Sequence, residues 1–404
     1  MKPQPYSLVL SILVAACTSA SADLTEPVSL GTGDGQPDRI VQIEGGGGTV
    51  CARSEAGAVL CWGDRQLTLD HPRIVAAHGE VLAASSLYED HDCSFDALPV
   101  RLDIEDAVRI DLGLRFGCAL RASGHVACWG GVPQDLVENL GANEPTDLPG
   151  ISRAVALATG PNSVCAALAD GEIICQGQTS AAGRSRAFDD APAALVAVDA
   201  FDDVYCALSK AGNVRCTSEA DGSWEDVIFP EAIERLSGGW AGVCGQDRSG
   251  RAWCSGDRNT GLLPGMPYDL PGSVALTAEA RRAAEFDGFD LLTMGGSSFH
   301  GHTICAVRET GEITCSSQNR NGELLEAAPL NANGDSPERP WISLGLNASA
   351  VAVSARSVCI IDALGVACWG TWGEALHCID GHVPNGPTVP GRYEQRSPVR
   401  MLRH

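Results

Sequence analysis

The stretch Gly117-Cys-Ala-Leu-Arg-Ala-Ser-Gly-His-Val-Ala-Cys-Trp-Gly130 decides the fold of this 404-residue chain. Cys118 and Cys128 lie ten positions apart, and Gly124 follows the first by six. Six further pairs repeat this pattern, the last of them with a spacing of nine: Cys51 and Cys61, Cys165 and Cys175, Cys206 and Cys216, Cys244 and Cys254, Cys305 and Cys315, and Cys359 and Cys368. Each has its glycine at the same position: Gly57, Gly171, Gly212, Gly250, Gly311 and Gly365. The first cysteines recur about every 51 residues, a period typical of propeller blades.

The spacing of each pair predicts a β-hairpin. A three-residue loop four to six positions after the first cysteine, built as a type I turn followed by a left-handed residue, needs glycine third. Counting outward from this loop pairs cysteine with cysteine. If the residues that flank the loop form a hydrogen-bonded pair, alternation makes the cysteines a non-hydrogen-bonded pair, close enough for a disulfide. A zinc site would instead need Cys-x-x-Cys spacing or Cys/His clusters.

Short apolar segments that end in glycine precede the hairpins, as in Ala107–Gly113, Ile233–Gly239 and Leu291–Gly296. Residues 99–102 (Pro-Val-Arg-Leu) are interpreted as the opening strand of a blade. Three or four short strands in each repeat are typical of an all-β propeller. The one helix expected covers 276–286, in an insertion.

Residues 117–130 and 50–63 resemble repeats of the regulator of chromosome condensation family, in particular its bacterial, cysteine-bearing branch. The family repeat ends in Trp-Gly and often continues into Asn-x-x-Gly-Gln-Leu-Gly, of which 257–263 and 319–325 are degenerate versions. The resemblance covers about residues 39–404 and implies a seven-bladed β-propeller. Its hairpins are expected at about 51–61, 118–128, 165–175, 206–216, 244–254, 305–315 and 359–368.

The repeats also depart from the family pattern. Only three hairpins end in Cys-Trp-Gly, with Trp62, Trp129 and Trp369. The middle blades are degenerate, so their completeness is open. The seventh hairpin is one residue short, an absence assigned to the segment between Gly365 and Cys368.

Two cysteines outside the pattern, Cys93 and Cys378, follow the first and seventh hairpins, which are neighbours in a closed ring. We expect a Cys93–Cys378 disulfide to lock the ring. The alternative is a zinc site, because His91, His377 and His382 are nearby in sequence. The C-terminal segment 397–402 (Ser-Pro-Val-Arg-Met-Leu) is expected to join the sheet of the first blade and close the ring by strand exchange.

The N-terminus predicts export. An apolar run over Leu8–Ala16 is too short to span a bilayer and has the length of a signal-peptide core. It ends in Leu13-Val-Ala-Ala-Cys17, which resembles a bacterial lipobox; the alternative is ordinary cleavage after Ala22. Residues 1–16 are therefore interpreted as a lipoprotein signal peptide, Cys17 as the lipidated residue and 17–38 as a flexible linker. Thr18 and Ser19 follow Cys17, and by resemblance to the sorting rules of enteric lipoproteins these residues favour the outer membrane. We therefore expect the protein in the cell envelope, where it faces the periplasm or the cell surface.

Composition restricts the partners. The formal net charge of −23 argues against nucleic-acid binding, which needs basic patches. Hydrophobic residues make up 44%, typical of a globular chain. His300 and His302 are interpreted as packed or exposed residues near the ring axis, in preference to metal ligands. No catalytic motif, metal site or cofactor site is predicted.

The predicted function is therefore a non-enzymatic, monomeric binding or scaffold protein. It is tethered to the membrane only through its lipid, and its propeller loops contact a protein or glycan. The first alternative is a propeller-based glycan-processing enzyme, disfavoured by the lack of sialidase-type aspartate boxes and by only five tyrosines. The second, nucleotide exchange by family analogy, is disfavoured by export and by the negative charge. Another role known in the family, β-lactamase inhibition, implies that exported members can bind proteins tightly.

Overall fold

The computed structural model of the chain describes residues 28–29, 38–64, 74–75, 81–82, 95–114, 116–131, 145–198, 204–218, 220–239, 242–256, 279–297, 301–317, 324–325, 341–355, 357–370 and 395–403. Within these ranges, no helix has the length and apolarity needed to cross a bilayer. Several sequence predictions lie outside the described residues: the signal peptide, most of the linker, Cys17, the Cys93–Cys378 disulfide, and the histidines His91, His300, His377 and His382.

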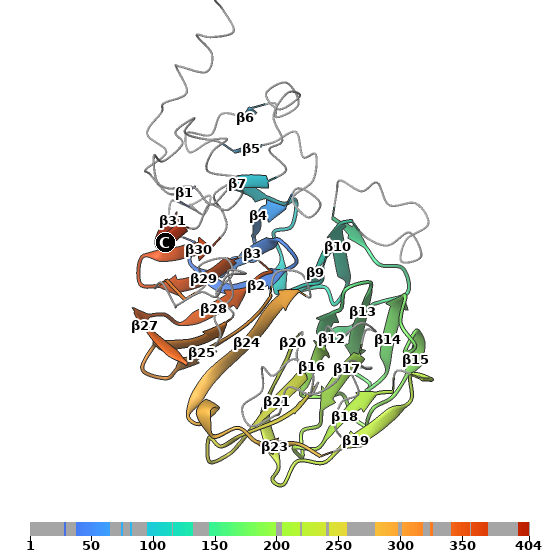
Figure 1. Cartoon of the computed structure of the whole chain (residues 1–404). Coiled ribbons are helices and arrows are strands. Elements are labelled where there is room, and N and C mark those ends of the chain that lie inside the picture. The colour runs from blue at the N-terminus through green and yellow to red at the C-terminus, as the bar shows by residue number, and fades with distance from the viewer. Residues whose placement is uncertain are drawn as a thin grey trace, which may run out of the picture.

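Seven antiparallel blades follow one another along the chain (Figure 1). Blade 1 consists of β2 (Ile40–Gly46), β3 (Thr49–Ser54), β4 (Val59–Asp64) and β7 (Phe95–Arg101), and blade 2 of β8 (Ala107–Leu112), β9 (Phe116–Arg121), β10 (Val126–Gly130) and β11 (Thr146–Asp147). Blade 3 consists of β12 (Ala154–Thr159), β13 (Ser163–Leu168), β14 (Ile173–Gly177) and β15 (Gly183–Ser185), and blade 4 of β16 (Ala194–Val198), β17 (Val204–Leu208), β18 (Val214–Thr217) and β19 (Trp224–Val227). Blade 5 consists of β20 (Ile233–Gly239), β21 (Gly242–Asp247), β22 (Ala252–Gly256) and β23 (Arg281–Arg282). Blade 6 consists of β24 (Phe289–Ser297), β25 (Gly301–Arg308), β26 (Glu312–Ser317) and β27 (Ile342–Asn347). Blade 7 consists of β28 (Ala350–Val353), β29 (Ser357–Asp362), β30 (Gly365–Gly370) and β31 (Gln395–Arg403). The short strands β5 (Ile74–Val75) and β6 (Val81–Leu82) pair with each other between β4 and β7 in the chain.

The blades form a closed ring. The innermost strand of each blade contacts the innermost strand of the next, and β28 of blade 7 contacts β2 of blade 1 (Figure 1). At the closure, the Ala355 N–H donates to the Gly47 carbonyl. A side chain at Gly45 would place its Cβ 2.4 Å from the Val353 carbonyl oxygen, so the two blades meet backbone to backbone. The all-β, seven-bladed fold expected from the repeats is confirmed, and the degenerate middle blades are complete.

The hairpins have the expected register, and each first cysteine pairs directly with the second. The Cα atoms of the seven pairs lie 4.0–4.1 Å apart, a separation typical of non-hydrogen-bonded cross-strand pairs. Every pair forms a disulfide: Cys51 with Cys61, Cys118 with Cys128, Cys165 with Cys175, Cys206 with Cys216, Cys244 with Cys254, Cys305 with Cys315, and Cys359 with Cys368.

The turn glycines have positive φ in all seven hairpins: Gly57, Gly124, Gly171, Gly212, Gly250, Gly311 and Gly365. In the first six hairpins this glycine is the left-handed residue expected at the third position of the loop, whereas Gly365 is the first residue of β30. In the seventh hairpin Asp362 pairs with Gly365, so the missing residue is in the turn and not between Gly365 and Cys368.

The glycine turns also join neighbouring blades. The Gly124 carbonyl accepts a hydrogen bond of 2.9 Å from the Ala154 N–H, where the inner strand of the next blade begins. Four other turns make the equivalent bond, in the pairs Gly57–Ala107, Gly212–Ile233, Gly250–Gly288 and Gly311–Ala348. One residue type therefore serves both the turn within a blade and the contact between blades.

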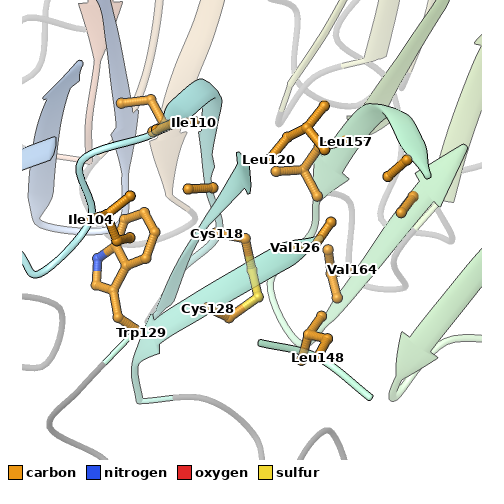
Figure 2. Close-up of a cluster of buried hydrophobic side chains, with 14 of the residues drawn as sticks. Ile104, Ile110, Cys118, Leu120, Val126, Cys128, Trp129, Leu148, Leu157 and Val164 are labelled. Atoms are coloured by element: carbon orange, nitrogen blue, oxygen red, sulfur yellow. A yellow bond between two sulfur atoms is a disulfide. The ribbon is translucent and has the colours of Figure 1, made fainter. Parts of the chain in front are cut away.

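Apolar side chains fill the space between blades. Around blade 2, Leu120 and Val126 face Leu157 and Val164 of blade 3, and the Cys118–Cys128 disulfide lies within the same buried cluster (Figure 2). Burial of this kind is the main favourable contribution to folding. The disulfides therefore belong to the cores of the blades.

Two expectations about chain segments are wrong. The C-terminal segment does not enter blade 1: β31 is the outer strand of blade 7, paired with β30, and β1 (Val28–Ser29) adds a parallel fifth strand beside it. Residues 99–102 likewise do not open a blade, because β7 is the outer strand of blade 1. Outer strands pair with their own blade because β4 and β30 already present a free edge to them.

The prediction of a helix over 276–286 is also wrong for residues 279–286, the part of this range that the structure describes. β23 pairs with β22, and only a 3-10 turn, η2 (Ala284–Phe286), follows it. The open edge of β22 offers inter-strand hydrogen bonds that override the local helical pattern.

Candidate binding site

A cavity of about 610 Å³ lies at the centre of the ring. The innermost strands of all seven blades line it, from β2 through β28. Their residues therefore converge on one space although they come from repeats spread over the whole chain.

One structural position sets the chemistry of this cavity. It is the residue of the inner strand that pairs with the first cysteine of the blade's hairpin. In blades 1 to 7 this residue is Glu44, Asp111, Ala158, Val196, Ser237, Thr293 and Ala352. The two carboxylates at this position, Glu44 and Asp111, lie in adjacent blades and face the same cavity.

Hydrogen bonds hold these carboxylates and link three blades. The Gln42 side-chain amide donates to Glu44 Oε1 at 2.9 Å and to the Ile110 carbonyl of blade 2 at 2.8 Å. Asp111 Oδ2 accepts from the Thr159 N–H of blade 3 at 2.6 Å. Both acids are therefore held in place by the protein's own donors.

The pKa values of Glu44 and Asp111 are both raised. Burial and the nearby Asp111 charge raise the pKa of Glu44 to about 7, against the opposing effects of Gln42 and Arg109. Burial also raises the pKa of Asp111 to about 6, although Arg109 and the backbone N–H of Thr159 oppose it. The Arg109 Nε is buried and has no hydrogen-bond partner among the described residues. The single guanidinium group leaves the two acids incompletely neutralised.

Exposed valines occupy equivalent positions in three adjacent blades, and one of them, Val41, lines the cavity. The inner strands of blades 1, 2 and 3 each contain a β-bulge next to the hairpin turn, and the extra residue is a valine in each: Val41, Val108 and Val155. These residues, the valine arc, are 39%, 48% and 50% exposed. In blades 5 and 6 the bulge residue is acidic, Glu234 or Asp290. The face that carries the hairpin turns, here the turn face, therefore combines an apolar arc with charged groups.

The disulfide cysteines and turn glycines singled out in the sequence are not among the residues that line this cavity. The seven disulfides and turn glycines build the blades, and His302 is on β25. Among the described residues, no cluster of three or more His, Cys, Asp or Glu is arranged to hold a metal ion. Sequence reasoning missed Glu44 and Asp111. Their signal was an acid seven positions before the first cysteine in the first two repeats.

Comparison with known proteins supports the fold. No protein-family model and no curated protein matches the sequence. Yeast RCC1 (Prp20), solved bound to Kap60, matches with a TM-score of 0.57 and 16% identity over 78% of either chain. The chain has an RCC1-type propeller fold.

Two further solved structures are similar to this chain. Prp20p from Saccharomyces cerevisiae matches with a TM-score of 0.52 and 15% identity, covering 70% of this chain and 72% of that one. Human WBSCR16 matches with a TM-score of 0.52 and 14% identity, covering 81% of this chain and 91% of that one. At such identities the RCC1-type likeness concerns architecture, and function has to be argued from the site.

Proposed function

We propose that this RCC1-type propeller is an exported, membrane-tethered, non-enzymatic protein that binds a protein partner on its turn face. The observation that carries the proposal is the valine arc beside the acidic cavity. Exposed apolar groups gathered on one surface, with charged groups around them, mark protein interaction sites. Prp20p has binding properties toward Gsp1p and histones, and yeast RCC1 was solved bound to Kap60. These precedents support a protein partner.

A binding role also fits the state of the carboxylates. Glu44 and Asp111 accept hydrogen bonds from Gln42 and from backbone N–H groups of Leu112 and Thr159. These bonds fix both side chains in place, as expected of groups that recognise a ligand.

Export is supported by the cysteines and by the N-terminal sequence. Seven disulfides need an oxidising compartment to persist. The lipobox-like segment then makes Cys17 the attachment point of the lipid anchor. Metabolic labelling with an alkyne fatty acid should mark the wild-type protein and leave Cys17→Ala unlabelled; labelling of both would contradict the anchor.

The binding role is tested by capture of partners from the native envelope after cross-linking, with the full chain as bait. The double variant Val108→Asp with Val155→Asp places charges in the valine arc. The matched control Ile228→Asp changes a residue that is 57% exposed and directly follows β19, the outer strand of blade 4. We expect the arc variant to lose at least tenfold of a specific captured protein and the control to retain it. Equal capture by both variants contradicts the turn face as the site, and robust glycan hydrolysis by the purified protein contradicts the non-enzymatic role.

A further inference from the structure

The central cavity has an uncompensated acidic side. Its charged lining consists of four carboxylates and two guanidinium groups: Glu44, Asp111, Asp290, Glu309, Arg109 and Arg235. Arg235 forms an ion pair with Asp290 of the next blade. Among the described residues, Arg109 is the cation whose charge acts on both Glu44 and Asp111. The excess of acid points to a ligand that brings positive charge.

A second feature of the same wall also points to a ligand. Thr159, whose N–H donates to Asp111, is 2% exposed, and its hydroxyl has no hydrogen-bond partner among the described residues. Thr159 lines the cavity, as does Arg109 with its unpartnered Nε. Buried polar atoms without partners are uncommon in folded proteins and call for an explanation. An acceptor supplied from outside would satisfy both groups.

We infer that the cavity receives a basic side chain, arginine or lysine, of the bound protein, seated beside Glu44 and Asp111. The inference rests on the proposed function and names the chemistry of the partner. The cationic group would bind the two carboxylates, and backbone carbonyls next to it would offer acceptors to Arg109 and Thr159. Apolar residues flanking the basic one would cover the valine arc.

A peptide segment fits these features better than a simple ion. A metal ion would need more ligands than this wall offers, since no three-residue cluster of ligating side chains is present in the described part of the chain. A free anion would meet the net negative charge of the lining. A basic peptide alone supplies positive charge, carbonyl acceptors and apolar contacts together.

The test uses two small probes, N-acetyl-arginine methylamide and its neutral isostere N-acetyl-citrulline methylamide. They are titrated into the isotopically labelled, oxidised mature chain at pH 8, while the amide resonance of Thr159 is followed by NMR. This amide reports on the site because it is bonded to Asp111. We expect a saturable shift with the arginine probe and binding at least tenfold weaker with the citrulline probe.

Two variants and a control complete the test. Glu44→Gln removes a charge while keeping an acceptor for the Gln42 side chain. Asp111→Asn likewise removes a charge and keeps an acceptor for the Thr159 N–H. Each should weaken binding of the arginine probe at least fivefold. The control Glu312→Gln changes a carboxylate paired with Arg308 on β26 and should leave binding unchanged. No saturable shift, equal binding of both probes, or indifference to both variants overturns the inference.

The inference and the proposed function fail separately. If Glu44→Gln and Asp111→Asn capture the partner as well as wild type, while the double variant of Val108 and Val155 does not, the turn face remains the binding surface and the inference about the cavity is wrong. If the arginine probe binds as expected but no protein depends on the valine arc, the proposed protein-binding function is wrong.

Discussion

Replacing Gly124 by alanine measures how much the packing of a hairpin turn against the next blade contributes to the free energy of unfolding. Gly124 has φ +80°, and an alanine Cβ there would lie 2.8 Å from the Arg153 Cα and 2.9 Å from the Arg153 nitrogen. The left-handed conformation costs a non-glycine residue about 1–2 kcal/mol. The contact with backbone atoms of blade 3 adds about 1–3 kcal/mol, as overpacking does elsewhere.

Gly150 provides the matched control. Its φ of +77° is nearly the same, but an alanine Cβ at this position meets no atom within 4 Å. Gly150→Ala should therefore lose only about 1–2 kcal/mol of unfolding free energy, from the backbone conformation alone. Urea unfolding of both variants, with disulfides intact, gives the difference. Equal losses in the two variants would refute the reasoning that the turn packs against the next blade.

Two other predictions concern stability. Replacing Cys118 and Cys128 together by alanine should lower the unfolding free energy by about 3 kcal/mol, the value expected for a closed loop of this length; an unchanged urea midpoint would contradict a stabilising disulfide. The pKa of Glu44 is raised from 4.5 to about 7, and that of Asp111 from 3.8 to about 6. Between these pH values the folded state therefore binds more protons than the unfolded state. Stability should therefore fall as pH rises from about 4 to 7, and Glu44→Gln should flatten this slope; a variant with the wild-type slope would show that Glu44 does not titrate in this window.

The electrostatic surroundings of Glu44 support the pH prediction. Asp111 and Arg109 face it from β8, and Arg53 of β3 donates to the Gln42 side chain that in turn bonds Glu44. Glu44 and Asp111 are the two groups of this set whose pKa values are raised, so both contribute to the fall in stability.

The hairpins could be read from the sequence because they are local. The partner of Cys118 is ten residues away, and the turn between them needs a left-handed residue that glycine supplies. Seven cysteine pairs, six with a spacing of ten and one with a spacing of nine, then predicted the number of blades and the all-β class. The seventh hairpin shows the same rule at work, since a two-residue loop keeps Cys359 opposite Cys368.

Assignments that depend on distant partners could not be read in this way. The Pro-Val-Arg segments of β7 and β31 have the composition of an opening strand, but the free edges of β4 and β30 make them outer strands. The helical pattern before Phe286 was likewise overridden by the edge of β22. In each case the competing hydrogen-bond partner is far away in sequence.

The sequence alone determined the repeat, the pairing of each first cysteine with its second and the turn glycine of the first six hairpins, because short loops and backbone conformation depend on neighbouring residues. Only the tertiary structure decided that Glu44 and Asp111 line one cavity and that Val41, Val108 and Val155 occupy the same bulge position in three adjacent blades. Each blade contributes one inner strand, so these side chains come together only when the packing of β28 against β2 closes the ring.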